Sequence, residues 1–302
     1  MTTDMDEMRV SSDSVVPHEF SGAHGNRLNA SIYRGGAKPV LFFHGGGQTR
    51  HAWDNAARAV QAAGYTAIAV DLRGHGDSEW VADQRYAFDD YAADIDAVAR
   101  KVQETFGGQR PVSVGASLGG ISSLVAQYEA GQSLLSALIL VDVTPRMRRD
   151  GVDRILGFMS DRMQDGFGSL QEAADTIAAY LPNRGRPKSL DGLSKNLRLG
   201  EDGRYRWHWD PAFISGPHPV NSGKLRSDEY RFAATRALTI PTLLVRGRQS
   251  ELVSEEHAEE FLELVPHARL TDVSGAGHMV AGDRNDIFLQ AIMEFLDGLG
   301  AG

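Results

Sequence analysis

Short apolar runs that alternate with helix-length amphipathic stretches constrain the fold of this chain more than any other feature. Such runs occupy residues 39–43, 66–70, 111–114 and 137–141, and each is bounded by glycine or a polar turn. Continuous apolarity over so few residues indicates a strand buried on both faces, as in a parallel sheet covered by helices. The spacers of about 25 to 40 residues fit right-handed crossovers. We therefore predict an α/β fold with a mostly parallel sheet.

The same rhythm extends to both ends of the chain. Two β-rich stretches around a turn-forming run predict a hairpin over residues 15–34. Near the carboxyl end, strands are expected at 241–245 and 269–273, with helices at 254–264 and about 285–296.

Between Pro145 and Tyr230 the alternation stops and helical signals replace it. Ser169 and Glu172 have the spacing of a capping box, and apolar residues then recur at helical spacing as far as residue 181. We predict a helical lid at 145–229, inserted after the sixth strand into a core of 1–144 and 230–302. Aromatic residues at 205, 207 and 209 recur with period two, which fits either packing inside a small subdomain or a pocket wall.

One Gly-x-Ser-x-Gly pattern, Gly115 to Gly119, lies directly between a buried-strand pattern and a helical pattern. A nucleophilic serine at a strand-to-helix turn adopts a strained conformation, and side chains two residues before and after it would collide unless they are small. Glycine at both positions meets that requirement. The pattern predicts that Ser117 is a nucleophile; the alternative is a structural turn serine.

Four motifs together carry a resemblance to a known family. They are HGGG at 44–47, DLRGHGDS at 71–78, GASLGG at 115–120 and GAGHMVAGD at 275–283. In this order they resemble the α/β-hydrolase superfamily, in its branch of capped serine esterases, haloperoxidase-like enzymes and carbon-carbon bond hydrolases. The resemblance implies an α/β-hydrolase fold and spans most of the chain outside the lid.

The resemblance also places the catalytic base and its acid. It implies that His278, in a glycine-rich loop before the last helix, takes the proton of the serine. The base needs a carboxylate that fixes its tautomer. Glu251, after the strand at 241–245, is the preferred acid because it gives the expected chain order, although the family usually has Asp there. Asp142, after the strand at 137–141, is the alternative, since some relatives carry the acid at that place.

Backbone amides are expected to bind the oxyanion that forms during attack. Leu118 would supply one amide, and the HGGG loop another, with Gly46 preferred over Gly45 and Gly47. His44, His75, Arg73 and Asp77 are expected to hold turns. The residues proposed to line the substrate pocket are Gly45, Trp53, Trp207 and Trp209.

Composition narrows the possible partners. A net charge of −9 argues against a nucleic-acid partner, and the absence of cysteine excludes disulfides and thiolate chemistry.

The longest apolar run, Ala137 to Val141, is too short for a membrane span of roughly 20 residues. The first fourteen residues are polar and acidic and lack an export signal, so we expect a frayed tail and a cytoplasmic protein. No metal or cofactor motif is present, and the oligomeric state does not follow from the sequence.

These observations predict a serine hydrolase that cleaves a small carboxylic ester through an acyl-enzyme. Lactonase, perhydrolase or haloperoxidase, and carbon-carbon bond hydrolase activities could use the same residues. A ligand-binding receptor on the same fold is the non-enzyme alternative. Serine at 117 excludes epoxide hydrolases and haloalkane dehalogenases, which attack carbon with a carboxylate.

Overall fold

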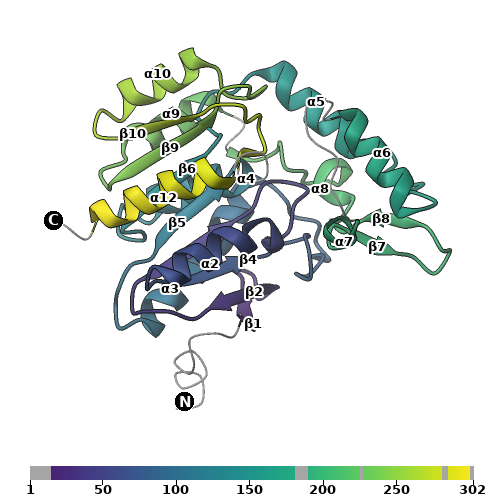
Figure 1. Cartoon of the computed structure of the whole chain (residues 1–302), viewed down its shortest axis with the longest axis horizontal. Helices are drawn as coiled ribbons and strands as arrows, with labels where there is room; N and C mark the ends of the chain where they lie inside the picture. The colour runs from purple at the N-terminus through teal and green to yellow at the C-terminus, as the bar shows by residue number, and fades with distance from the viewer. Residues whose placement is uncertain (1–14, 181–189, 225–226, 281–284, 300–302) are drawn as a thin grey trace.

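A computed structural model describes residues 15–180, 190–224, 227–280 and 285–299 (Figure 1). Its centre is an eight-stranded sheet in the order β1-β2-β4-β3-β5-β6-β9-β10. All neighbouring strands from β4 to β10 pair in parallel, while β1 and β2 form an antiparallel hairpin at one edge. The predicted α/β fold with a mostly parallel sheet is therefore confirmed.

The strands fall where the apolar runs predict them, with ends shifted by one or two residues. Almost all residues of the five central strands are buried; these strands are β3, β4, β5, β6 and β9. Burial on both faces explains why their apolar runs are continuous and do not alternate. The sheet consists of β1 (Val15–Ser21), β2 (Arg27–Tyr33), β3 (Pro39–Phe43), β4 (Thr66–Val70), β5 (Val112–Ala116), β6 (Ala137–Val141), β9 (Thr242–Gly247) and β10 (Arg269–Val273).

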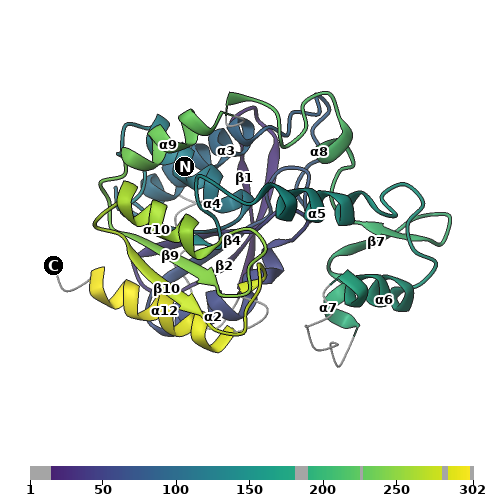
Figure 2. The same ribbon diagram turned by 90° about the horizontal axis from the view of Figure 1, so that it is seen from above.

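Helices cover both faces of the sheet and create two apolar cores (Figure 2). On one face, α2 (Asp54–Ala62) and α12 (Asn285–Leu299) pack together, preceded by the 3-10 turn η1 (Arg50–Trp53). The other face carries α3 (Phe88–Thr105), α4 (Leu118–Glu129), α9 (Asp228–Arg236) and α10 (Glu255–Leu264).

The described residues between β6 and α9 form an arm at the carboxyl ends of the strands (Figures 1 and 2), and apolar side chains of the arm such as Phe213 join the core on the α4 face. It contains α5 (Arg149–Ser160), α6 (Leu170–Tyr180), α7 (Asp191–Ser194), β7 (Leu197–Leu199), β8 (Tyr205–Trp207) and α8 (Ala212–Ser215). The hairpin of β7 and β8 is a difference from the all-helical prediction. Its cause is the period-two pattern of aromatics, which suits a strand and not a helix.

A serine side chain caps the start of α6 and of α10. Ser169 accepts the amide hydrogen of Glu172 at 3.1 Å and starts α6. The Glu172 carboxylate binds the amide of Gly168, not that of Ser169, so only half of the predicted box forms. Ser254 similarly caps α10.

The expected tail at 1–14 and the last predicted position of α6, residue 181, lie outside the described residues. None of the helices in the described ranges is long and apolar enough to cross a bilayer.

Candidate active site

Ser117, Asp142, His278 and the glycine loop lie at one edge of the sheet, because parallel strands end on the same side. Ser117 follows β5, Asp142 follows β6, and His278 lies beyond β10. The glycine loop at 44–47 follows β3. The β5–β6 register pairs Ala116 with Val141, so Ser117 and Asp142 each stand one residue past that pair on neighbouring strands.

Ser117 occupies a sharp bend between β5 and α4. Its φ of 44° and ψ of −111° lie in a region that non-glycine residues rarely adopt. The bend is held from both sides, since the Ser117 amide donates to the Val141 carbonyl at 3.2 Å and its own carbonyl accepts the Ile121 amide at 3.0 Å. Such strain costs about 1–3 kcal/mol and persists only where the surroundings impose it.

The two motif glycines are required by close backbone contacts. A Cβ at Gly119 would lie 2.4 Å from the carbonyl oxygen of Phe43, and one at Gly115 would lie 2.6 Å from the backbone of Gly119. The predicted steric reason for Gly-x-Ser-x-Gly is therefore confirmed. The Gly119 amide also donates to the His44 carbonyl at 3.2 Å, which ties the start of α4 to the HGGG loop.

His278 and Asp142 form the hydrogen-bonded pair of the site. His278 Nδ1 lies 2.7 Å from Oδ2 of Asp142, whose side chain is fully buried. The carboxylate also accepts the Gly247 amide at 3.0 Å and the Ser250 hydroxyl at 2.6 Å. Because the carboxylate acts as acceptor, Nδ1 carries a hydrogen, and in a neutral ring the lone pair is then on Nε2. This is the tautomer that a general base needs.

The structure pairs His278 with the alternative carboxylate and not with Glu251, the preferred one. Within the described part of the chain, no hydrogen bond joins Glu251 to His278. The Glu251 backbone packs on α5, since a Cβ at Gly151 would lie 2.2 Å from its carbonyl oxygen. Burial and, secondarily, the Glu251 charge raise the pKa of Tyr180 on α6 to about 12. Glu251 thus faces the arm, whereas Asp142 follows the strand next to Ser117.

Two loops are fastened together so that His278 reaches the acid. After β9, the Arg248 amide donates to the Val273 carbonyl at 3.0 Å, and the Gln249 amide donates to the Ala276 carbonyl at 2.9 Å. Gly275 adopts a φ of 76° in the same loop. The loop that carries His278 therefore lies beside the loop that carries Ser250.

The amides expected to bind an oxyanion are those left without an acceptor. In the HGGG loop, Gly45 donates to Gln48 Oε1 at 3.0 Å and Gly47 donates to His75 Nε2 at 3.1 Å. Among the described residues, the amides of Gly46 and Leu118 have no such acceptor. A Cβ at Gly45 would lie 3.5 Å from the Ser117 Cβ, so this loop adjoins the serine. Free amides beside Ser117, the predicted nucleophile, are what the oxyanion prediction requires.

His44 and His75 are buried and bind backbone atoms, as expected for residues that hold turns. Nδ1 of His44 donates to the Gly45 carbonyl at 2.8 Å, and its Nε2 accepts the Leu72 amide at 3.0 Å. Nδ1 of His75 donates to the Arg73 carbonyl at 2.9 Å. Burial lowers the pKa of His44 to about 4 and that of His75 to about 3, so both rings are neutral near pH 7.

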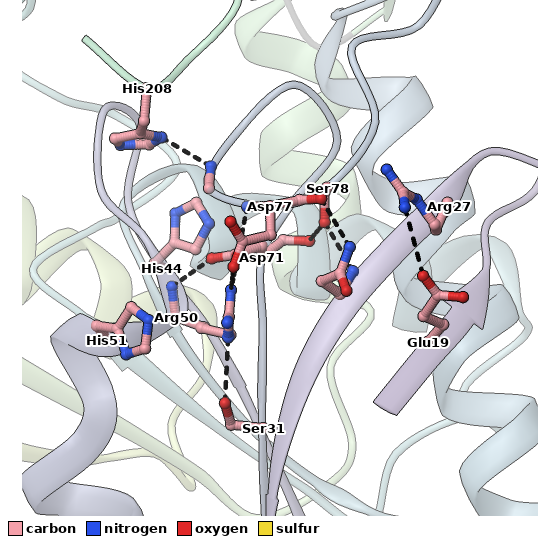
Figure 3. A network of polar contacts seen from close by, with 12 residues as sticks. Glu19, Arg27, Ser31, His44, Arg50, His51, Asp71, Asp77, Ser78 and His208 are labelled. Carbon is pink, nitrogen blue, oxygen red and sulfur yellow. Dashed lines mark hydrogen bonds and ion pairs between the residues drawn. The ribbon is translucent and has the colours of Figure 1, made fainter. Parts of the chain in front are cut away.

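A charged network supports the DLRGHGDS loop (Figure 3). Asp71 is buried and accepts the Arg50 amide at 2.6 Å, the Asp77 amide at 3.0 Å and the Arg50 guanidinium. Arg50 also pairs with Asp77 at 2.7 Å. Arg73 forms two hydrogen bonds with Asp94, at 2.7 and 2.6 Å. The prediction that Arg73 and Asp77 are structural agrees with these contacts.

The three tryptophans proposed for the pocket lie in different places. Trp53 is a correction: its ring packs between Phe42 and Phe288, in the core under α2 and α12, which is the face opposite α4. Trp207 packs inside the arm against Phe158 and Phe167. Only Trp209 adjoins the site, because its Nε1 would lie 3.7 Å from a Cβ at Gly47.

Other residues beside the glycine loop were not predicted. A Cβ at Gly46 would lie 3.2 Å from the ring of Phe213, and one at Gly47 would lie 2.8 Å from Met159. Gln48 donates from Nε2 to the sulfur of Met279 at 3.1 Å and so bridges the glycine loop to the His278 loop. Phe213 and Met159 belong to the arm, where the sequence carries no family motif to single them out. The described ranges contain no cluster of three or more residues suited to a metal ion.

These features define a hydrolase. The family model for the alpha/beta hydrolase fold matches residues 38–284, and the chain belongs to that family. It is 29% identical to "Esterase Rv0045c" of Mycobacterium tuberculosis over 92% of this chain and 89% of that protein. It is also 29% identical to "2-(acetamidomethylene)succinate hydrolase" of Mesorhizobium japonicum over 90% of this chain and 92% of that protein.

The fold agrees with solved structures as well. The crystal structure of E-2-(acetamidomethylene)succinate hydrolase superposes with a TM-score of 0.79 at 27% identity, covering 94% of this chain and all of that chain.

Proposed function

We propose that the chain is a serine carboxylesterase that acts on a small ester through an acyl-enzyme. The observation that carries the proposal is the 2.7 Å contact of His278 Nδ1 with buried Asp142, one strand away from a strained Ser117. An imidazole that is held by a buried carboxylate, at the same edge of the sheet as Ser117, supports nucleophilic acyl transfer, in which it would take the proton of the serine hydroxyl. The esterase name of a relative over 92% of the chain supports the same chemistry.

In acylation, Ser117 Oγ attacks the ester carbonyl carbon while His278 Nε2 removes the hydroxyl proton. Asp142 stabilises the imidazolium that forms. The carbonyl oxygen becomes negatively charged and accepts hydrogen bonds from the amides of Leu118 and Gly46, each worth about 10² to 10³ in rate. The tetrahedral intermediate collapses when His278 returns the proton to the departing alkoxide, which leaves as the alcohol.

Deacylation repeats these steps with water. His278 Nε2 takes a proton from a water molecule, the resulting oxygen attacks the acyl carbon, and the same two amides bind the new oxyanion. Collapse breaks the bond to Ser117 Oγ, which regains its proton from His278, and the carboxylic acid leaves. No redox partner is required.

In this proposal the predicted lid at 145–229, which includes most of the arm and the first two residues of α9, shapes the substrate site. Met159, Trp209 and Phe213 come from it and contact the glycine loop. These apolar side chains suit a small uncharged acyl group. The protein is proposed to act in the cytoplasm on a small-molecule carbonyl substrate, without nucleic acid.

Substitution of Ser117 tests the proposal. Ser117→Ala should reduce hydrolysis of p-nitrophenyl butyrate at least about 10³-fold and abolish labelling by a fluorophosphonate, with unchanged circular dichroism. Retained activity in Ser117→Ala would refute the serine mechanism. An unlabelled wild-type serine together with measurable ligand binding would favour the receptor alternative. The alternative activities are compared in three further assays. Hydrolysis of lactones tests for a lactonase, peracid formation from acetate and hydrogen peroxide tests for a perhydrolase, and cleavage of dienoate diketones tests for a carbon-carbon bond hydrolase.

A further inference from the structure

A histidine of the arm reaches into the loops of the core. His208 follows β8 and is 2% exposed. Its Nδ1 accepts the Gly76 amide at 2.7 Å, the contact marked at His208 in Figure 3. Its Nε2 contacts the Gly47 carbonyl at 3.3 Å. Since Nδ1 is an acceptor, the hydrogen is on Nε2, which donates to Gly47. One ring of the arm therefore joins the DLRGHGDS loop to the HGGG loop.

Gly47 is held by imidazoles on both sides. Its amide donates to His75 Nε2 at 3.1 Å, and its carbonyl accepts from His208. The rings of His75 and His208 lie 5.9 Å apart, and that of His44 lies 5.2 Å from His75. His44 in turn binds the Gly45 carbonyl. The two peptide groups that flank Gly46 are thus tied to buried rings: His44 binds the Gly45 carbonyl of the first, and His75 binds the Gly47 amide of the second. His208 binds the next peptide group, through the Gly47 carbonyl.

The glycine loop needs such external ties. Three consecutive glycines have no side chains of their own to pack, and glycine loses the most conformational freedom on ordering. Gly47 also adopts a φ of 77°, which only glycine enters readily. An amide that must already point at the oxyanion has to be fixed before the reaction, because reorientation during the step would cancel the benefit.

The His208 ring is suited to this role. Burial and the neighbouring imidazoles of His75 and His44 lower its pKa well below the ordinary value. The ring therefore stays neutral and keeps Nδ1 as an acceptor for Gly76. Further contacts fix the same segment, since the Asp210 amide donates to the Gly74 carbonyl at 2.8 Å and Trp80 donates to the His208 carbonyl at 3.3 Å.

We propose that His208 is a positioning residue for the oxyanion amide of Gly46, so that the arm contributes to the chemical step as well as to substrate binding. This inference rests on the proposed esterase function. Through its contact with Gly47, the arm would then help to stabilise the transition state. His208 touches no reacting atom.

Three substitutions separate the two hydrogen bonds of the ring. His208→Gln can place an amide nitrogen near the position of Nε2 and keep only the donor to Gly47. His208→Asn can place an amide oxygen near the position of Nδ1 and keep only the acceptor for Gly76. His208→Phe keeps an aromatic ring and loses both hydrogen bonds. Leu199→Ala is the control, because Leu199 lies on β7 of the same arm and is 62% exposed.

The measurements are kcat and KM for p-nitrophenyl butyrate, normalised to sites titrated to completion with a fluorophosphonate, and the affinity for a trifluoromethyl ketone. This ketone adds to the serine and forms an oxyanion, so its binding reports on the donors. We expect kcat to fall about tenfold in His208→Asn and His208→Phe, with KM within about twofold and ketone affinity reduced in parallel. His208→Gln and Leu199→Ala should stay within about threefold of the wild type.

Wild-type kcat and ketone affinity in His208→Asn, or a change confined to KM, would overturn the inference. Equal losses in the Gln and Asn variants would also overturn it, because the tie to Gly47 would then not matter. If the Phe variant does not fold, the Gln and Asn pair still decides. Ser117→Ala distinguishes this failure from failure of the proposed function, since an active Ser117→Ala removes the function whatever His208 does.

Discussion

Ser250 donates its hydroxyl to Asp142 Oδ2 at 2.6 Å, on the same carboxylate oxygen that lies 2.7 Å from His278 Nδ1. Ser250 Oγ also accepts the amides of Leu252 and Val253, each at 3.0 Å. The hydroxyl is therefore fixed by two donors and can orient the carboxylate. The loop after β9 thus supports the carboxylate that contacts His278, although it does not supply that carboxylate.

Ser250→Ala should lower kcat about tenfold because Asp142 loses one of three donors and can rotate away from His278. Steady-state hydrolysis of p-nitrophenyl butyrate measures this effect. Ser254→Ala is the matched control: it removes the cap of α10 four residues later, which should cost about 1 kcal/mol of stability and leave kcat unchanged. Equal kcat values in both variants would argue against a role for Ser250 in orienting the acid.

Substitution of the two candidate acids should give opposite results. Asp142→Asn should reduce kcat by about 10² or more, because the amide cannot stabilise the imidazolium and favours the wrong tautomer of His278. Glu251→Gln should change kcat less than about threefold, since Glu251 faces the arm near Tyr180. The pair of kcat values at pH 7.5 checks this. If kcat falls only in Glu251→Gln, the partner of His278 in catalysis is Glu251, as the chain order favours, and not Asp142.

The sheet could be predicted from the sequence because burial on both faces leaves a continuous apolar run. The strained bend at Ser117 could be predicted because Gly115 and Gly119 meet a backbone constraint that is local to β5 and α4. The acid could not be chosen in this way. Asp142 and Glu251 both follow strands at the same edge of the sheet, and the choice depends on contacts with Gly247, Ser250 and His278, which are distant in sequence.

The prediction that Trp53 lines the pocket failed for a related reason. An aromatic residue near a motif can face either side of the sheet, and Trp53 turns toward α12. The period-two aromatics did carry a signal, which was a hairpin and not a helix. His208 stands within that pattern, yet its partners Gly47 and Gly76 are supplied by loops more than 100 residues earlier, with sequence separations of 161 and 132. No local pattern predicts such contacts.

Gly115→Ala should destabilise the protein and stop fluorophosphonate labelling, because the added carbon would lie 2.6 Å from the backbone of Gly119 and Gly120. These are backbone atoms, which cannot move aside for the added carbon as the end of a flexible side chain could. Thermal unfolding and labelling measure both effects. Gly157→Ala is the control, since it lies within α5 with no atom within 4 Å of the added Cβ, and alanine should raise helix stability by up to about 1 kcal/mol. A stable, labelled Gly115→Ala would contradict the steric argument.

The buried imidazoles should make folding sensitive to mild acid. Histidine in the unfolded chain has a pKa of about 6.5, whereas burial lowers the pKa of His44 to about 4 and that of His75 to about 3 in the folded protein. Above pH 6.5 both states hold the neutral rings, so this stability is fully present. As the pH falls below 6.5, the unfolded state binds protons that the folded state excludes. The free energy of unfolding should then decrease by about 1.4 kcal/mol per pH unit for each ring, until the folded pKa is reached.

His75→Gln tests this linkage, because glutamine can accept the Gly47 amide and does not titrate. Urea unfolding at pH 7.5, 6.5, 5.5 and 4.5 should give a stability curve whose slope below pH 6.5 is smaller by about 1.4 kcal/mol per pH unit than that of the wild type. Asp54, whose pKa is lowered to about 2, loses its contribution only below about pH 4 and does not interfere. Identical slopes would mean that His75 is protonated in the folded protein, and the neutral ring that accepts the Gly47 amide would have to be abandoned.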